Sequence, residues 1–289
     1  MPSAAAALTR RHAVAAATEA LATAGVDSAR ADAEWLLAGL LQVGRAALYL
    51  DADISAVVAA RYARMVDRRA RREPLQRVLG WEEFHGLRFR LTGAVLVPRP
   101  ETEILVDWAL ALLPPPAPGS RLTAVDVGSG SGCIACALAR RRPDLEVIAL
   151  DVSLEAAAVA RANAARLALG ARVGVVVADL LTAVRPGRAD LIVANLPYLP
   201  SESLCFLAPE VADHDPRLAL DGGPDGLDVI RRLVGESRER LAPGGVLVLE
   251  TAGAAQARAV TALMNEAGFR RVLVHNDLTE IERFVAARG

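Results

Sequence analysis

Residues 195–198, Asn-Leu-Pro-Tyr, are the chemically most informative stretch of the sequence. They follow an apolar, β-rich run, so we expect them at the carboxyl end of a strand, where open α/β sheets bind ligands. The side chain of Asn195 offers an acceptor and two donors, and the step to Pro197 keeps Leu196 extended, with its carbonyl free to point into a cleft. These two groups would accept the N–H groups of a substrate amine or amide, while Tyr198 would stack on a flat group or wall the cleft. The alternative is a turn with a packed tyrosine.

A glycine-rich stretch lies at residues 126–132, Asp-Val-Gly-Ser-Gly-Ser-Gly. An apolar run precedes it and a helical pattern follows it, and a strand that turns into a helix in this way is typical of a nucleotide site. Glycine lets the backbone pass close beneath a ligand because it has no side chain. The spacing differs from the Gly-x-Gly-x-x-Gly of dinucleotide sites. The stretch therefore indicates a nucleotide-type ligand, although such turns also close α/β units that bind none.

Acidic residues end the next two predicted strands. Asp151 ends the second, where a carboxylate can accept hydrogen bonds from both hydroxyls of a ribose. The alternative role for Asp151 is a cap for the helix predicted after it. Asp179 and Leu180 end the third, where the acid could bind an adenine amino group and the apolar side chain could cover the ring. The alternative for Asp179 is an ordinary loop aspartate.

Seven apolar runs occur from residue 122 onward, and helical stretches separate the early ones. This alternation predicts an α/β fold over residues 98–289, a doubly wound domain with a mostly parallel sheet. The runs are 122–127, 146–150, 173–177, 191–194, 246–249, 272–274 and 281–285. The last two lie close together, which predicts an antiparallel pair at the edge of the sheet.

Two different patterns precede this domain. Residues 1–78 carry alanine, leucine and valine at helical spacing and predict a small helical bundle. Its helices are expected over 8–24, after the cap residues at 27–28, and over 55–73. Residues 79–97 predict a β-hairpin that links the two domains. A further helix is expected over 101–112, because prolines precede it and acids occupy its first turn.

The composition excludes several classes of protein. The 33 cations are all arginine. The absence of lysine excludes enzymes that form a lysine Schiff base and P-loop proteins that bind phosphate through a lysine. The net charge of −1 argues against a body that wraps nucleic acid, and a hydrophobic share of 53% argues against disorder. Charges or prolines interrupt every apolar run that could otherwise span a membrane. Three cysteines, an odd and sparse set, favour a reducing compartment, and we expect a cytoplasmic protein.

The third predicted helix is rich in arginine. Its arginines are Arg61, Arg64, Arg68, Arg69, Arg71 and Arg72, with Arg77 just beyond. Only Asp67 and Glu73 oppose them. The 61–77 segment is either a docking patch for RNA or an acidic protein, or a solvated helix face in a chain without lysine.

Other reactive residues give weaker patterns. Cys133 and Cys136 have redox or zinc spacing, but no second pair exists and we interpret them as small packing residues. No Gly-x-Ser-x-Gly elbow supports a serine hydrolase. We expect no metal site.

The elements above, in this order, resemble the class I S-adenosylmethionine-dependent methyltransferases, and residues 195–198 resemble the tetrapeptide of those that methylate nitrogen. Two stretches resemble the linker signature of the protein-glutamine methyltransferases that act on peptide chain release factors. They are Phe-His-Gly-Leu-Arg-Phe at 84–89 and Val-Leu-Val-Pro-Arg-Pro-Glu-Thr-Glu at 95–103. Residues 215–223, 225–227 and 241–245 are similar to further signatures of that family. The likeness covers most of the chain from about residue 75, and the bundle matches by architecture.

The resemblance implies a fold, a reaction and a set of site residues. It implies a Rossmann-like domain with a seven-stranded sheet, which methylates the glutamine of a Gly-Gly-Gln loop, and a bundle that recognises the substrate. Residues implied for S-adenosylmethionine are Asp126, Gly128, Ser129, Gly130, Gly132, Asp151, Asp179, Leu180 and Asn195. Those implied for the protein substrate are Phe89, Pro98, Arg99, Pro100, Glu101 and Thr102. Those implied for catalysis are Asn195, Leu196, Pro197 and Tyr198.

Two positions depart from the family pattern. Leu196 replaces the first proline of the usual Asn-Pro-Pro-Tyr, and Asn-Leu-Pro-Tyr is also typical of ribosomal RNA adenine dimethyltransferases. Thr251 and Ala252 follow Glu250 where the family more often has Ile or His and then Gly. Two alternatives stay open: an N-methyltransferase acting on RNA adenine or a small molecule, and a non-enzymatic binding module with this fold.

Overall fold

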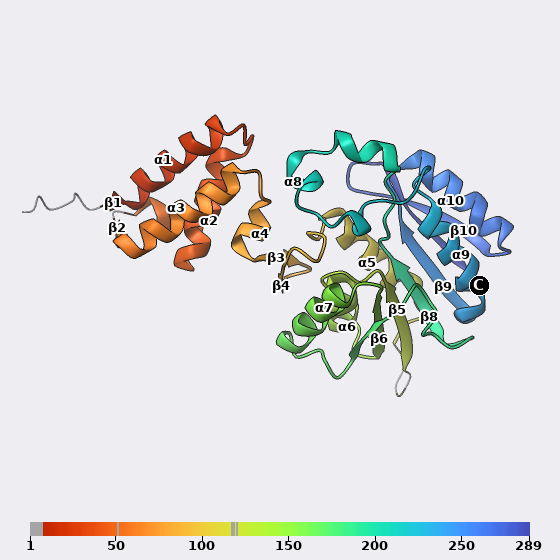
Figure 1. Ribbon diagram of the computed structural model, residues 1–289. Helices are drawn as coiled ribbons and strands as arrows, with labels where there is room; N and C mark the ends of the chain where they lie inside the picture. The colour runs from red at the N-terminus through yellow and green to blue at the C-terminus, as the bar shows by residue number, and fades with distance from the viewer. Residues whose placement is uncertain (1–7, 51, 117–118, 120) are drawn as a thin grey trace, which may run out of the picture. The chain divides into compact units, whose positions relative to one another are not determined.

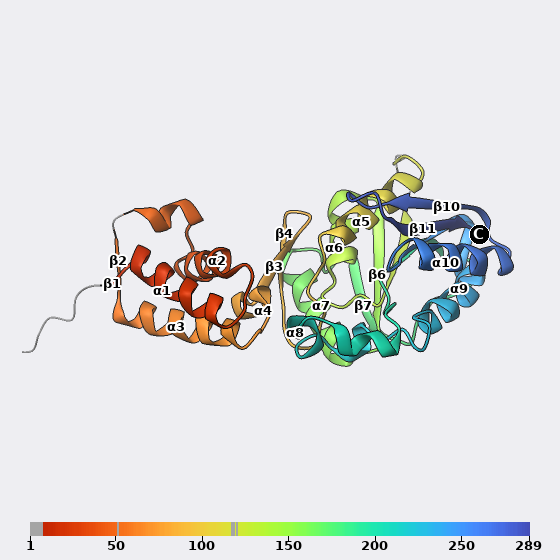
Figure 2. The ribbon, with the colours of Figure 1, turned by 90° about the horizontal axis from the view of Figure 1, so that it is seen from above.

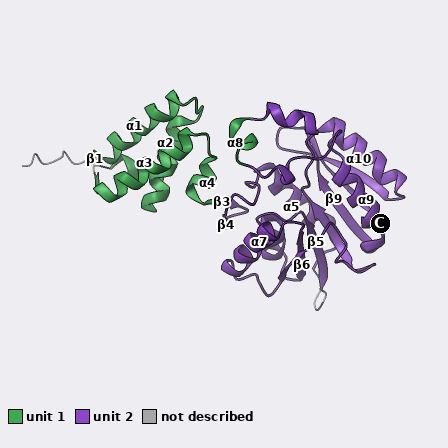
Figure 3. Cartoon of the chain, viewed as in Figure 1, with its two compact units in different colours: residues 1–81, 208–214 green, residues 82–207, 215–289 purple. Residues whose placement is uncertain are grey.

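The computed structural model describes residues 8–50, 52–116, 119 and 121–289. The chain forms two compact units (Figure 3). One contains residues 1–81 and 208–214, and the other contains residues 82–207 and 215–289. The first seven residues of the predicted bundle lie outside the described residues.

The first unit is built on the predicted helical bundle. Its helices are α1 (Arg10–Thr23), α2 (Ala29–Leu41), η1 (Arg45–Tyr49), α3 (Ala56–Ala70) and α4 (Leu75–Leu79). Leu21, Leu36 and Leu37 are fully buried in its core. The expected helical start at residue 8 is wrong, because β1 (Leu8–Thr9) pairs with β2 (Asp53–Ile54) and Thr9 caps α1. A cap residue has extended backbone angles, so it can also end a strand.

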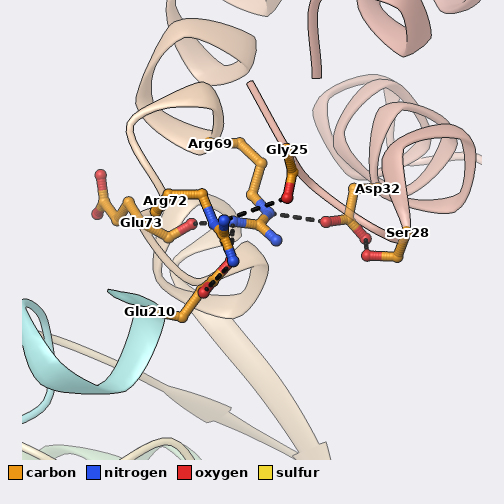
Figure 4. Close-up of polar contacts among 7 residues, drawn as sticks. All are labelled: Gly25, Ser28, Asp32, Arg69, Arg72, Glu73 and Glu210. Atoms are coloured by element: carbon orange, nitrogen blue, oxygen red, sulfur yellow. Dashed lines mark hydrogen bonds and ion pairs between the residues drawn. The ribbon is translucent and has the colours of Figure 1, made fainter. Parts of the chain in front are cut away.

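A short segment from later in the chain belongs to this unit (Figures 3 and 4). It contains the single-turn helix α8 (Pro209–Ala212), and Glu210 on it binds two arginines. Arg69 Nη1 lies 2.9 Å from Glu210 Oε1, and Arg72 reaches both carboxylate oxygens at 2.6 and 2.8 Å. Arg69 Nε also donates to Asp32 at 2.7 Å. Arg69 is therefore a buried structural residue, neither on a solvated face nor free to dock a partner.

The second unit contains the predicted seven-stranded sheet (Figure 1). Its strands lie in the order β10-β11-β9-β8-β5-β6-β7. They are β5 (Leu122–Val127), β6 (Leu145–Asp151), β7 (Val173–Val177), β8 (Ala189–Ala194), β9 (Leu241–Glu250), β10 (Arg270–Asn276) and β11 (Glu282–Arg288). Strands β5 to β9 pair in parallel, and β11 is antiparallel to both β9 and β10. The α/β fold, the parallel sheet and the antiparallel final pair are confirmed.

Helices cover both faces of this sheet (Figure 2). One face packs against α5 (Glu101–Leu112), α6 (Cys133–Arg141) and α7 (Leu154–Arg166), and the other packs against α9 (Asp228–Arg240) and α10 (Ala254–Glu266). Successive strand residues alternate between the two cores: Ala124 lies in the first, and Val125 lies in the second. This period of two gives the sheet a core on each face. The parallel pairing of β5 to β9 brings the residues that follow these strands to one edge of the sheet.

The predicted hairpin is present and shorter than the 79–97 stretch. It consists of β3 (Trp81–Phe84) and β4 (Leu87–Arg90), joined by a two-residue turn. His85 and Gly86 both have positive φ angles, 49° and 69°, as a hairpin turn of this length requires. Residues 91–100 have no regular structure, and Leu91, Val95 and Val97 pack in a small core with Ala156 of α7.

Within the described residues, none of the helices combines enough length with enough apolar character to cross a membrane.

Candidate active site

A cavity of about 630 Å³ opens in the second unit at the carboxyl ends of the parallel strands. The residues that directly follow β5, β6 and β8 line it: Gly128, Val152 and Asn195. The volume suits a ligand of nucleoside size. This is the ligand-binding edge of an open α/β sheet, as predicted from the strand ends.

The glycine-rich turn forms one wall of the cavity. The backbone N–H groups of Gly128 and Ser129 both donate to the Leu150 carbonyl at 2.9 Å, which fixes the turn against β6. Gly128 has a φ angle of 73°, and a Cβ atom there would lie 2.9 Å from Leu196 Cδ2. Gly132 has a φ angle of 78°, and its Cβ would lie 3.1 Å from that of Ala160. Glycine is therefore required at both positions.

Two buried polar atoms near this turn have no partner among the described residues. They are Oγ of Ser129, which lines the cavity, and Oδ1 of Asp126. The other oxygen of Asp126 accepts from the Ala135 N–H at 3.1 Å. Burial raises the pKa of Asp126 to about 7, and the Asp151 carboxylate adds to the rise while the Ala135 N–H opposes it. Unpaired buried polar atoms are costly, and a bound polar ligand would satisfy them.

Asp151 is the last residue of β6 and Asp179 follows β7, and these two acids are held differently. Asp151 is buried, and its two oxygens accept from the N–H groups of Gly130 and Ser153 at 2.8 and 2.9 Å. Each oxygen keeps a lone pair for a ribose hydroxyl. Asp179 is exposed and forms an ion pair with Arg232 at 2.7 Å, while Leu180 is buried. All three predicted residues line the cavity.

Asn195 is held by residues from two other elements. Its Nδ2 donates to Thr102 Oγ1 at 3.0 Å, and that hydroxyl lies 2.8 Å from Glu250 Oε2. Thr102 lies in the first turn of α5 and Glu250 ends β9. Asn195 thus lies at the cavity wall with Leu196 and Pro197.

Tyr198 ends the tetrapeptide beside the second core. It is half-buried, and burial raises the pKa of its hydroxyl to about 12. Its carbonyl accepts from Gln256 Nε2 at 2.9 Å, and a Cβ atom on Gly226 would lie 2.3 Å from the same oxygen. Within the described part of the chain, Tyr198 does not line the cavity, unlike the three residues before it.

The residues predicted to bind the substrate separate into three places. Pro98, Arg99 and Thr102 line the cavity, and Arg99 forms an ion pair with the buried Asp215 at 3.0 Å. Pro100 and Glu101 are exposed next to them at the start of α5. Phe89 is fully buried in the first core, with its ring edge-on to that of Phe84.

The predicted packing residues Cys133 and Cys136 also lie in that core, and burial raises the pKa of each thiol to about 12.

The sequence prediction missed two residues of the site, Glu250 and Gln256. A usable signal exists for Glu250: Ala194 pairs with Leu249, so Asn195 and Glu250 directly follow paired residues of neighbouring strands. A polar residue after a buried strand at this edge is a site candidate for the same reason as Asn195. No local signal marks Gln256.

The chain is similar to known families and proteins. It matches the PrmC N-terminal domain over residues 12–80 and the Methyltransferase small domain over residues 106–204. Over 270 residues it is 42% identical to the release factor glutamine methyltransferase of Geobacter sulfurreducens, covering 93% of this chain and 92% of that protein. Its identity to the protein of the same name from Cereibacter sphaeroides is 43%, over 94% and 96% of the two chains. The solved catalytic domain of hMettl16 shares the fold, with 15% identity and a TM-score of 0.58 over 81% of this chain and 82% of that one.

The fold and the site define a class I methyltransferase, an enzyme that uses S-adenosylmethionine as its methyl donor. The cavity residues fit this donor: the turn leaves no room for a side chain at Gly128 or Gly132, Ser129 has a hydroxyl without a partner among the described residues, and Asp151 is oriented for a ribose. Within that class, the chain belongs to the release factor glutamine methyltransferase family.

Proposed function

We propose that this chain methylates the side-chain amide nitrogen of the glutamine in the Gly-Gly-Gln loop of peptide chain release factors. The observation that carries the proposal is the position of Asn195 at the cavity wall, with its Nδ2 held by Thr102. This leaves Oδ1 of Asn195 as an acceptor for a substrate N–H. The names of the relatives support a glutamine of a release factor as that substrate.

This reaction depends on the positioning of the substrate amide more than on an acid or a base. An amide nitrogen is a poor nucleophile because its lone pair is delocalised into the carbonyl. S-Adenosylmethionine supplies an electrophilic sulfonium methyl group that needs no acid to leave. Asn195 Oδ1 and the Leu196 carbonyl would accept the two amide N–H groups and so orient the nitrogen. In this transfer an N–C bond would replace the S–C bond of the donor, and the nitrogen would then lose one proton to water.

The remaining residues of the tetrapeptide would shape the slot for the glutamine side chain. Pro197 lines the cavity, and the backbone of Tyr198 is held by Gln256. The side chain of Leu196 is buried and packs over Gly128, so leucine is accommodated where the family usually has proline. The backbone carbonyl of residue 196 remains, and it is the group that the reaction needs.

Recognition of the whole release factor would involve both predicted domains. We propose that residues 1–78 contribute to substrate recognition, that 79–97 link the bundle to the methyltransferase domain at 98–289, and that the enzyme works in the cytoplasm. Pro98, Arg99 and Thr102 line the cavity, and Pro100 and Glu101 are exposed beside them, which supports a contact with the substrate there. Phe89 would act only by supporting that region, because it is buried.

The test is methyl transfer by the full chain from labelled S-adenosylmethionine to a purified release factor. Asn195→Ala is expected to lower kcat by about 1,000-fold, because it removes an acceptor that orients the nucleophile. Calorimetry is expected to show S-adenosylmethionine binding to Asn195→Ala within about twofold of wild type. Full activity of this variant would contradict the role of Asn195.

The same assay separates the proposed substrate from RNA. Ribosomal RNA is incubated in parallel, because Asn-Leu-Pro-Tyr is also typical of RNA adenine methyltransferases. Label on the glutamine of the release factor supports the proposal, and label on RNA alone overturns it. The ion pairs of Arg68, Arg69, Arg71 and Arg72 within the first unit give the arginine segment a structural role of its own.

A further inference from the structure

Asn195 is connected to a buried carboxylate through one hydroxyl. The chain of contacts runs from Asn195 Nδ2 to Thr102 Oγ1 at 3.0 Å and from Thr102 Oγ1 to Glu250 Oε2 at 2.8 Å. Thr102 and Glu250 are each only 2% exposed. The residue after β8, the first turn of α5 and the last residue of β9 therefore meet in this chain of contacts, which we call the Asn195 relay.

The relay has a defined direction when Glu250 is ionised. An ionised carboxylate only accepts hydrogen bonds, so the single proton of the Thr102 hydroxyl is donated to Glu250. The Thr102 oxygen must then accept from Asn195, and only the amide nitrogen of that side chain can donate. Nδ2 is thereby held toward Thr102, and Oδ1 is left for the substrate.

Protonation of Glu250 removes this constraint. A protonated Glu250 can donate to Thr102, whose own proton is then free to be donated to Oδ1 of Asn195. The amide can turn over, and its nitrogen would meet the substrate N–H instead of its oxygen. Two donors facing each other make no hydrogen bond, so this orientation does not hold the glutamine.

The surroundings of Glu250 place this change near neutral pH. Burial raises the pKa of Glu250 to about 7, and Glu101 on α5 adds to the rise. The Thr102 hydroxyl, the charge of Arg283 on β11 and the side chain of Asn195 itself oppose it. Arg283 is itself in an ion pair with Asp277 at 2.8 Å. Tyr198 also faces Glu250, and burial raises its pKa to about 12, so its hydroxyl stays neutral in this range.

We propose that Thr102 and the ionised Glu250 are positioning residues that fix the Asn195 side chain with Oδ1 toward the amide nitrogen to be methylated. The proposal rests on the proposed function for its substrate. The orientation of Asn195 itself can be measured without any substrate.

The first experiment measures kcat and KM of the full chain with a purified release factor. Thr102→Val keeps the shape and removes the hydroxyl, and we expect kcat to fall roughly 30-fold with S-adenosylmethionine affinity within about twofold of wild type. Thr102→Ser restores the hydroxyl and is expected to recover most of the lost rate. Wild-type kcat in Thr102→Val, or no recovery in Thr102→Ser, would overturn the relay.

The second experiment measures the pH dependence. Wild-type kcat is expected to fall about tenfold per pH unit below pH 7, and Glu250→Gln, which cannot ionise, is expected to lack this acidic limb. Glu210→Gln is the matched control, because it changes a carboxylate that binds Arg69 and Arg72 and takes no part in the relay, and it should keep the limb. An unchanged acidic limb in Glu250→Gln contradicts the proposal.

A third measurement uses no substrate and separates this inference from the proposed function. The side-chain ¹⁵N–¹H signals of Asn195, assigned by their loss in Asn195→Ala, are expected to shift with a midpoint near pH 7 in wild type and not in Glu250→Gln. A shift without methylation of the release factor supports the relay and contradicts the substrate. Methylation without a shift supports the substrate and overturns the relay.

Discussion

Two glutamates, one in each compact unit, lie in opposite environments. Glu210 in the first unit is bound directly by the guanidinium groups of Arg69 and Arg72 (Figure 4). Glu250 in the second unit is almost completely buried, and the groups that hydrogen-bond to it are neutral: the Thr102 hydroxyl and the Asn195 side chain. The two carboxylates respond to these environments with pKa changes of opposite sign.

The sign follows from the balance of burial and partners. At Glu210 burial raises the pKa, but the hydrogen bonds from Arg72, the backbone and Arg69 together outweigh it and lower the pKa to about 2. At Glu250 burial dominates and the pKa rises to about 7. A carboxylate paired with arginine stays charged and holds structure together. One buried beside a neutral hydroxyl can change its charge near neutral pH, which is typical of functional sites.

The largest expected effect tests the structural side of this comparison. Arg69→Met leaves the buried Asp32 without its guanidinium partner, so we expect the free energy of unfolding to fall by about 3–5 kcal/mol. Urea unfolding followed by circular dichroism measures it. Arg71→Met on the same stretch removes an exposed pair with Asp67 and should change the free energy of unfolding by less than about 0.5 kcal/mol. Equal effects of the two variants would contradict the distinction.

An intermediate effect contrasts the two glutamates directly. The folded-state pKa of Glu210 is about 2 against an ordinary 4.5, so its stabilisation is present above pH 4.5 and is lost as pH falls toward 2. Glu210→Gln should therefore lower the free energy of unfolding at pH 7, by about 2 kcal/mol.

Glu250 should show the opposite sign. Its folded-state pKa of about 7 lies above 4.5, so the charged form is penalised on folding and stability decreases as pH rises from 4.5 to 7. Glu250→Gln should raise the free energy of unfolding at pH 8 by about 2 kcal/mol, and the gain should vanish below pH 4.5. Urea unfolding of both variants from pH 3 to 8 measures the two slopes. The quantity compared is the difference in free energy of unfolding between each variant and wild type. If it changed with pH in the same direction for both variants, the contrast between the two glutamates would be contradicted.

The smallest effect concerns a hydroxyl outside both clusters. Oγ1 of Thr261 on α10 is buried without a partner among the described residues, in contrast to that of Thr102. Thr261→Val should leave kcat unchanged and change the free energy of unfolding by less than about 0.5 kcal/mol, toward greater stability. Thermal unfolding and the methylation assay measure both. If Thr261→Val lowered kcat as much as Thr102→Val, the effect at Thr102 would not be specific to its place beside Asn195.

The sequence by itself determined the features that depend on neighbouring residues. Apolar runs separated by helical stretches marked the strands of the sheet, because strands buried on both faces are apolar along their whole length. The glycine turn and Asn195 were identified because residues after parallel strands gather at one edge. The helix over 101–112 has the predicted bounds, since its start depends on the local proline and acidic residues.

Only the tertiary structure decided which distant residues meet. Thr102 and Glu250 are separated by 148 positions, and Arg69 and Glu210 by 141, yet each pair forms a hydrogen bond. No local pattern encodes such a pair, because it depends on how helices and strands pack. The sequence therefore determined that an asparagine stands at the ligand edge. Packing decided that a buried hydroxyl and carboxylate hold it, and that two arginines of the bundle bind Glu210, which follows them by 141 and 138 positions.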